Sequence, residues 1–159
     1  MYDWANSAYA TVIAGAVLPA YFVGTVVPGD TYRFLGREWA ADGLWGLVAG
    51  AGPLVMFLLI PVLGAIADFS ASKKRFLTVF ALIGSGFTTL LFFAAPGKVG
   101  TTIGIFLLAQ MGFVAANVFY DGFLPDLTTE ETIDRESSRG YALGYIGGGL
   151  YLLVGVVLI

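Results

Sequence analysis

The sequence contains no cysteine and no histidine, and few of its side chains carry charge. Without cysteine the chain can form neither a disulfide nor a thiolate metal site. Without histidine it lacks the commonest general base and metal ligand. Charged residues make up only 12% of the chain and the net charge is −3, so the composition does not favour binding to nucleic acid. We therefore expect no metal, no cofactor, no nucleic-acid partner and no enzymatic activity.

Long apolar runs dominate what the sequence does contain. Hydrophobic residues make up 58% of the chain, and the mean hydropathy is +0.84. Five stretches without Lys, Arg, Asp or Glu cover residues 5–27, 43–67, 76–95, 101–120 and 141–159, and a helix needs roughly 20 residues to cross a bilayer. The runs are continuous, which favours helices over barrel strands. The sequence predicts an all-α multi-pass membrane protein with five transmembrane helices, negligible strand and the lipid bilayer as a partner.

The distribution of basic residues predicts the orientation of these helices, because loops rich in Lys and Arg face the cytoplasm. The loops after the second and fourth runs hold five basic residues, against three in the other two loops. The five are Lys73, Lys74, Arg75, Arg135 and Arg139. We therefore expect the N-terminus and the second and fourth loops to lie in the cytoplasm, and the protein to reside in the cell membrane.

The last apolar run reaches Ile159 without a polar flank, a basic residue or an aromatic anchor. Apolar helices in membranes normally end in one of these features. We interpret residues 1–159 as a partial N-terminal transmembrane domain whose second half is absent. The alternative is a complete five-helix protein that assembles with further copies of itself.

The loop between the second and third runs places an acid and a basic cluster close together. Gly64 and Asp68 are one helical turn apart and share a face, and Lys73, Lys74 and Arg75 follow. The glycine would let a neighbouring helix approach, and the carboxylate could accept hydrogen bonds from helix ends or basic side chains. This pattern predicts a cytoplasmic latch that holds one conformation. A basic loop that only sets the topology is the alternative.

Charged residues elsewhere at the same rim extend this hypothesis. Asp121 and Asp126 flank the point where the fourth helix must end, because Pro125 follows. Together with Arg139, at the start of the fifth run, they could join the latch through ion pairs between helices. The other acids of that loop are expected to be solvated: Glu130, Glu131, Asp134 and Glu136.

Amide and phenol side chains mark a candidate solute path. Gln110, Asn117 and Asp121 are spaced by seven and four residues, so they form a polar stripe on one helix face. Polar groups are costly in hydrocarbon, and we expect Asn117 to face the centre of the bundle, toward the first helix. Hydrogen bonds that only hold helices together are the alternative. The path candidates are Asn6 and Tyr9 in the first run, Gln110 and Asn117 in the fourth, and Tyr145 in the fifth.

Glycines recur every four residues at the start of the fifth run, at Gly140, Gly144 and Gly148. Such a stripe of small residues lets another helix approach closely, and we expect it to pack against one. The third run has only Thr and Ser as polar residues. It contains no candidate site and is expected to face lipid.

Several stretches of the chain resemble a known family. The loop 64–75 resembles the loop signature of the major facilitator superfamily, although Phe69 stands where a basic residue is usual and Ala71 where a glycine is usual. Residues 2–10 (YDWANSAYA), 119–127 (FYDGFLPDL) and 137–149 (SSRGYALGYIGGG) resemble the vacuole effluxer family, the autophagy-related permease branch of that superfamily. The resemblance implies a carrier of twelve helices, of which this chain would form most of the N-terminal half.

The leading hypothesis for function is secondary transport of a small solute by alternating access. Pro19, Pro53 and Pro61 are expected to interrupt helices, as is common in carriers. The resemblance implies amino acids as the solute and, in a eukaryote, a vacuolar membrane. One alternative is a helical membrane subunit that does not transport. Another is an enzyme acting on lipid head groups, which Asp121 and Asp126 could serve, although no arginine follows the Asp-Gly pair as such a site would need.

Overall fold

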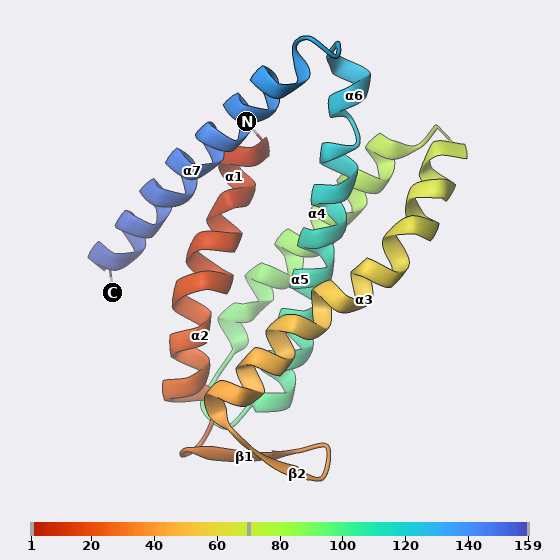
Figure 1. The fold of residues 1–159 in the computed structure, drawn as a ribbon. Helices are drawn as coiled ribbons and strands as arrows, with labels where there is room; N and C mark the ends of the chain where they lie inside the picture. Colours follow the sequence, from red (N-terminus) through yellow and green to blue (C-terminus); the bar gives the residue numbers. More distant parts are fainter. Residues whose placement is uncertain (1, 70, 159) are drawn as a thin grey trace. The chain divides into compact units, whose positions relative to one another are not determined.

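The computed structural model describes residues 2–69 and 71–158 (Figure 1). The chain divides into two compact units. Unit 1 comprises Met1–Tyr21 and Leu124–Ile159, and unit 2 comprises Phe22–Phe123.

The described residues contain five helices that are long and apolar enough to cross a membrane, by length and composition. This confirms the prediction of an all-α membrane protein with five transmembrane helices. The five spans are Tyr2–Val26, Ala41–Phe69, Lys73–Phe93, Val99–Leu127 and Ile133–Val157.

The first span is wound more widely than an α-helix over most of its length. The N–H of Leu18 bonds to the carbonyl of Ile13, and the N–H of Val27 bonds to that of Phe22 at 3.0 Å. These bonds reach back five residues instead of four, which is π-helical geometry. The elements of the span are α1 (Tyr2–Ala8), η1 (Tyr9–Val17), α2 (Leu18–Tyr21) and η2 (Phe22–Val26).

Two of the three expected proline interruptions do not occur. Helix α3 (Ala41–Phe69) runs continuously through Pro53 and Pro61. Each proline removes one backbone donor, and the remaining hydrogen bonds of this long helix keep it intact. Pro19 lies in α2, an α-helical turn between the two π-helical segments of the first span, so it stands where the winding of the helix changes.

The fifth span, α7 (Ile133–Leu158), begins eight residues before the apolar run expected from the sequence. Thr132 precedes it, and its hydroxyl oxygen accepts a hydrogen bond from the N–H of Thr129 at 3.0 Å. The carbonyl oxygen of Thr132 accepts a hydrogen bond from the N–H of Glu136 at 3.0 Å. Because this local hydrogen bonding does not depend on hydropathy, the charged start of α7 is helical too.

A two-stranded hairpin follows the first span, contrary to the expectation of negligible strand. Strands β1 (Thr31–Phe34) and β2 (Arg37–Ala40) pair antiparallel, with Phe34 opposite Arg37. Leu35 and Gly36 form the turn between them, both with positive φ, 49° and 78°. A two-residue turn of this handedness matches the twist of a hairpin. The alternation of polar and aromatic residues on β1 was the signal that hydropathy alone did not capture.

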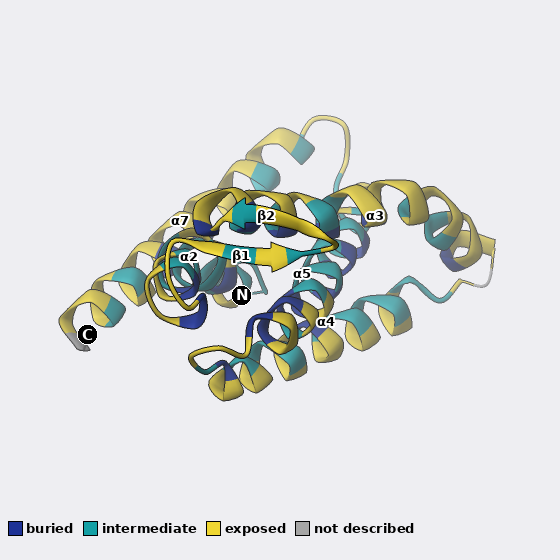
Figure 2. Ribbon diagram, turned by 90° about the horizontal axis from the view of Figure 1, so that it is seen from below, coloured by how far each residue is buried: buried dark blue, intermediate teal, exposed yellow. Residues whose placement is uncertain are grey.

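The core of unit 2 lies around helix α5 (Val99–Asp121), which has the largest buried share of the five spans. Aromatic rings from three elements meet there. The Trp45 ring of α3 lies 5.3 Å from the Phe22 ring and 4.7 Å from the Phe106 ring, between centroids. Figure 2 shows buried residues along α5, while the outer faces of α3 and α4 are exposed.

Helix α4 (Lys73–Leu90), with the short η3 (Leu91–Phe93), packs on α5 through glycine. A Cβ added at Gly112 would lie 2.7 Å from the Cα of Gly84, so the two backbones touch. Phe119 stacks near both Phe76 and Phe80, with centroids 5.2 and 5.8 Å apart. The expectation that this span faces only lipid is therefore wrong for one of its faces, because a glycine on each helix admits close contact.

We predict that Gly112→Ala destabilises the protein. The added methyl would meet the Gly84 backbone, which cannot move aside as a flexible side chain does, and overpacking of this kind costs about 1–3 kcal/mol. The melting temperature in detergent should fall. Gly104→Ala is the matched control on the same helix, since a Cβ there meets no atom within 4 Å. Equal melting temperatures for the two variants would contradict a tight crossing at Gly112.

Candidate functional site

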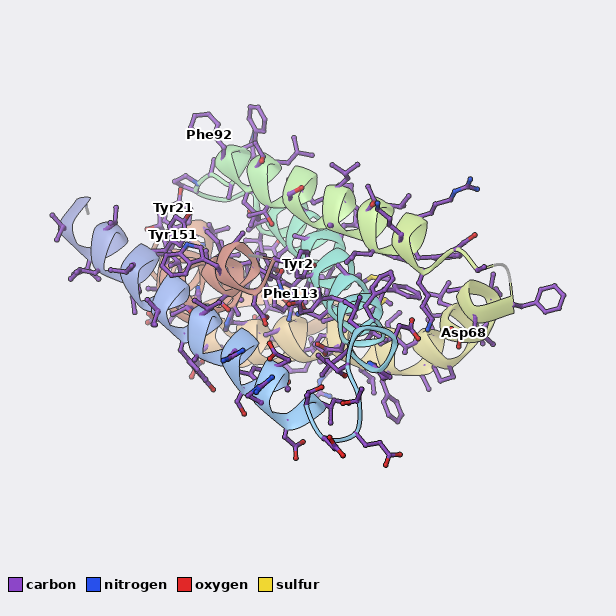
Figure 3. All side chains as sticks on the ribbon, turned by 90° about the horizontal axis from the view of Figure 1, so that it is seen from above. Tyr2, Tyr21, Asp68, Phe92, Phe113 and Tyr151 are labelled. Atoms are coloured by element: carbon purple, nitrogen blue, oxygen red, sulfur yellow. The ribbon has the colours of Figure 1, made fainter. Side chains whose placement is uncertain are left out.

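Lys73 connects three helices at one end of unit 2. Its Nζ lies 3.3 Å from Oδ1 of Asp68 near the end of α3, and it donates to the carbonyl oxygen of Gly122, just after α5, at 3.5 Å. Lys73 is itself the first residue of α4. A cation beside the final carbonyls of α5 is also favourable to that helix. Figure 3 shows Asp68 at the end of its helix.

The ion pair at this end is partly open to solvent. The side chains of Lys73 and Asp68 are 29% and 67% exposed. Exposed pairs contribute roughly 0–1 kcal/mol, less than a buried charge-assisted hydrogen bond. The arrangement therefore suits a contact that can break and re-form.

The turn after Asp68 explains why glycine is usual at position 71 in the superfamily signature. Ala71 has a φ of +48°, which lies in the left-handed region that glycine adopts most readily. A glycine would therefore be the natural residue at position 71. Phe69, the other departure, is 97% exposed.

The other residues expected in the latch from this loop have different surroundings. A Cβ added at Gly64 would meet no atom within 4 Å, so the close approach expected there is absent among the described residues. Lys74 and Arg75 are exposed, and within residues 2–69 and 71–158 neither has an ion-pair partner. Of the three basic residues in the cluster, Lys73 alone links helices.

Gln110 packs against α3 within unit 2. A Cβ added at Gly52 would lie 2.9 Å from Cγ of Gln110, so the glycine leaves room for this side chain. Gln110 and Asn117 are both half-buried on α5, and each has an interaction partner. The orientation of Asn117 toward the first helix stays a prediction.

In unit 1 the glycine stripe of α7 lies against the first helix. Added Cβ atoms at Gly140 and Gly144 would lie 2.8 Å from Oδ2 of Asp3 and 2.7 Å from Oγ of Ser7. One turn further on, a Cβ at Gly148 would lie 2.6 Å from Oγ1 of Thr11. Three polar side chains spaced by four residues thus lie along three glycines spaced by four.

The path candidates of unit 1 have contrasting exposure. Tyr9 is buried and Asn6 is half-buried, and each has an interaction partner. Tyr145 is 82% exposed, so its place on a solute path also stays a prediction.

The charged rim of α7 forms its own ion pairs. Arg139 lies 2.8 Å from Oε1 of Glu136, and Arg135 lies 3.2 Å from the same oxygen. Glu136 was expected to be merely solvated, and the helical start of α7 is what brings it within reach of Arg139. Asp121 is in unit 2 and Asp126 in unit 1; both have interaction partners. Nowhere in the described ranges do three His, Cys, Asp or Glu side chains gather into a group that could hold a metal ion.

Sequence reasoning missed the residues whose importance depends on a second helix. Gly52, Gly84 and Gly112 each lie among other glycines in apolar helices, and only the structure shows what lies opposite each. A weak signal existed for Gly112, which is followed by Ala116 four residues later. Such small-residue spacing is typical of close helix packing.

Comparisons with known proteins agree with the resemblance seen in the sequence. Residues 1–136 match the family described as vacuole effluxer Atg22 like. Over 159 residues, all of this chain and 36% of the relative, the sequence is 31% identical to the uncharacterized MFS-type transporter YxiO of Bacillus subtilis (strain 168). Over 112 residues, 69% of this chain and 28% of the relative, it is 30% identical to an uncharacterized protein of Aquifex aeolicus (strain VF5). The chain thus spans about a third of these curated relatives. No solved structure matches significantly.

We predict that Ala71→Gly stabilises the protein. The left-handed conformation at position 71 is unfavourable by about 1 kcal/mol for a residue with a Cβ, and glycine removes that strain. The melting temperature should rise slightly. Ala81→Gly, inside α4, is the control and should lower it, because glycine weakens a helix interior. A decrease for Ala71→Gly as large as for Ala81→Gly would contradict the strained turn.

Proposed function

The chain belongs to the vacuole effluxer Atg22-like family, and from this premise we propose that it is part of a secondary transporter that moves a small solute by alternating access. The five apolar spans make it a multi-pass membrane protein. The Bacillus relative is described as an MFS-type transporter. In the complete protein, the helices beyond this chain would supply the other side of the solute path.

The observation that carries the proposal is the amide pair of α5. Gln110 and Asn117 lie on the span with the largest buried share, where an apolar residue would serve packing as well. Amides at membrane depth are expensive unless they face protein or water. Their position on the central helix of unit 2 supports a polar path, with Asn6, Tyr9 and Tyr145 as further candidates from unit 1.

We propose amino acids as the solute. The apolar runs of this chain contain no Lys, Arg, Asp or Glu, so they offer no full charge to hold an ion at the membrane centre. Amides and hydroxyls suit a solute whose own charges cancel. The family description, vacuole effluxer, is consistent with export of such a solute.

The contacts of Lys73 serve as a cytoplasmic latch in this proposal. Lys73 joins the ends of three helices, so motion of α3 relative to α5 would break at least one contact. Since an exposed pair is worth at most about 1 kcal/mol, losing it shifts a two-state equilibrium by roughly fivefold or less. The latch would therefore tune the rate of transport without locking the protein.

The proposed transport is testable in vesicles with the protein encoded by the complete reading frame. We expect saturable movement of one or more neutral amino acids, and a large loss of it in Asn117→Ala. Leu108→Ala is the matched control on an exposed position of α5 and should transport normally. Amino-acid transport at wild-type rates in Asn117→Ala would remove this side chain from the path. No movement of any amino acid by the folded wild-type protein would contradict the proposed solute.

The latch is testable by comparing two neighbouring lysines. Lys73→Gln should change the turnover number by a few fold with little effect on the amount of folded protein. Lys74→Gln, one residue away and exposed, should have little effect. Asp68→Asn should behave like Lys73→Gln, and the two changes together should be no worse than either. Equal effects of Lys73→Gln and Lys74→Gln would show that the cluster only sets topology.

A further inference from the structure

The turn of the β1–β2 hairpin has an unusual residue at its tip. Leu35 has a φ of +49° and is 82% exposed. Turns of this kind favour Asn, Asp or Gly, because a leucine there is strained and gains nothing from water. Both the backbone conformation and the exposure of Leu35 are unfavourable for a leucine. This suggests that something outside the described residues contacts its side chain.

The hairpin has two chemically different faces. Tyr32 and Trp39 are cross-strand partners, and with Phe34 they form a half-buried aromatic face. Nε1 of Trp39 donates to the carbonyl of Phe34 at 3.2 Å. Arg33 and Glu38 lie opposite each other on the exposed face. Aromatic residues with polar tips are typical of the membrane–water interface.

The position of the hairpin matches that interface. It follows the first span, which ends at Val26, and Ala41 at its other end begins the second span. Within unit 2, Figures 1 and 2 show the ribbon lying at the start of α3, at the end opposite the Lys73 turn. In a bilayer crossed by these helices, a ribbon at their ends would lie at the depth of the lipid head groups.

The arginines of the hairpin are available to anions. The guanidinium carbon of Arg37 lies 5.6 Å from the centre of the Trp39 ring. In the part of the chain that the structure describes, neither Arg33 nor Arg37 has an ion-pair partner. Guanidinium groups match the geometry of phosphate oxygens.

We propose that the β1–β2 hairpin is a lipid anchor that lies in the head-group layer, with Leu35 inserted toward the acyl chains and Arg33 and Arg37 bound to lipid phosphates. The surface is continuous with the lipid-facing side of α3, whose exposed residues are largely apolar. The anchor would hold the end of unit 2 at a constant depth. This role is independent of which solute the complete protein moves.

The depth of the tip can be measured with nitroxide labels on the complete protein in vesicles of phosphatidylcholine and phosphatidylglycerol. Leu35→Cys carries the test label and Glu38→Cys the control, and any cysteines elsewhere in the protein are replaced by serine. The ratio of oxygen to nickel-chelate accessibility should be severalfold higher at position 35 than at position 38. Equal, water-like ratios would overturn the proposal. Dipolar broadening between labels at position 35, lost on dilution with unlabelled protein, would instead assign the tip to a second copy.

Two further variants separate insertion from hairpin folding. Leu35→Asn suits the turn better than leucine but removes the apolar group, so it should raise the mobility of the label at position 38 severalfold. No change would mean that protein contacts alone hold the hairpin and would overturn the anchor. Arg33→Gln combined with Arg37→Gln should lower the oxygen accessibility at position 35, and an unchanged value would overturn the binding of phosphates.

Discussion

Close backbone approach at glycine governs how the helices of this protein pack, because hydrocarbon gives apolar surfaces little reason to associate. In unit 2 the backbones of α4 and α5 touch at Gly84 and Gly112. In unit 1 the glycines of α7 lie along the polar stripe formed by Asp3, Ser7 and Thr11. Dispersion and backbone contact at short range therefore replace the hydrophobic effect that drives packing in soluble proteins.

Polar groups are few in this protein, and most lie where they are solvated or serve a contact. The Lys73–Asp68 pair is at a helix end and partly exposed, and Glu136 binds two arginines at the charged start of α7. Within the five uncharged apolar runs the polar side chains are neutral and are mainly amides and hydroxyls. Weak contacts at the ends and neutral polar groups in the middle are compatible with helices that move against one another, which a carrier requires.

Hydropathy predicted the five spans correctly but not the details that depend on hydrogen bonding or contact. The charged start of α7 is helical because Thr132 and its neighbours form local hydrogen bonds there. The hairpin was missed because its strands are only four residues long. Pro53 and Pro61 were expected to break α3 and do not, since a single lost donor is tolerated in a long helix. For the candidate site, the sequence singled out the acid and the basic cluster but could not distinguish Lys73 from Lys74.

The sequence by itself determined the number, the approximate limits and the helical nature of the membrane spans, together with the family, but not the π-helical winding of the first span. These properties follow from hydropathy summed along a local stretch, and the cost of an unpaired backbone group in lipid leaves a helix as the solution for each run. Only the tertiary structure decided which faces meet: that Gly112 touches Gly84, that Gly52 makes room for Gln110, and that Lys73 reaches both Asp68 and Gly122. Such contacts depend on the rotation and register of two helices at once, and no single helix encodes both.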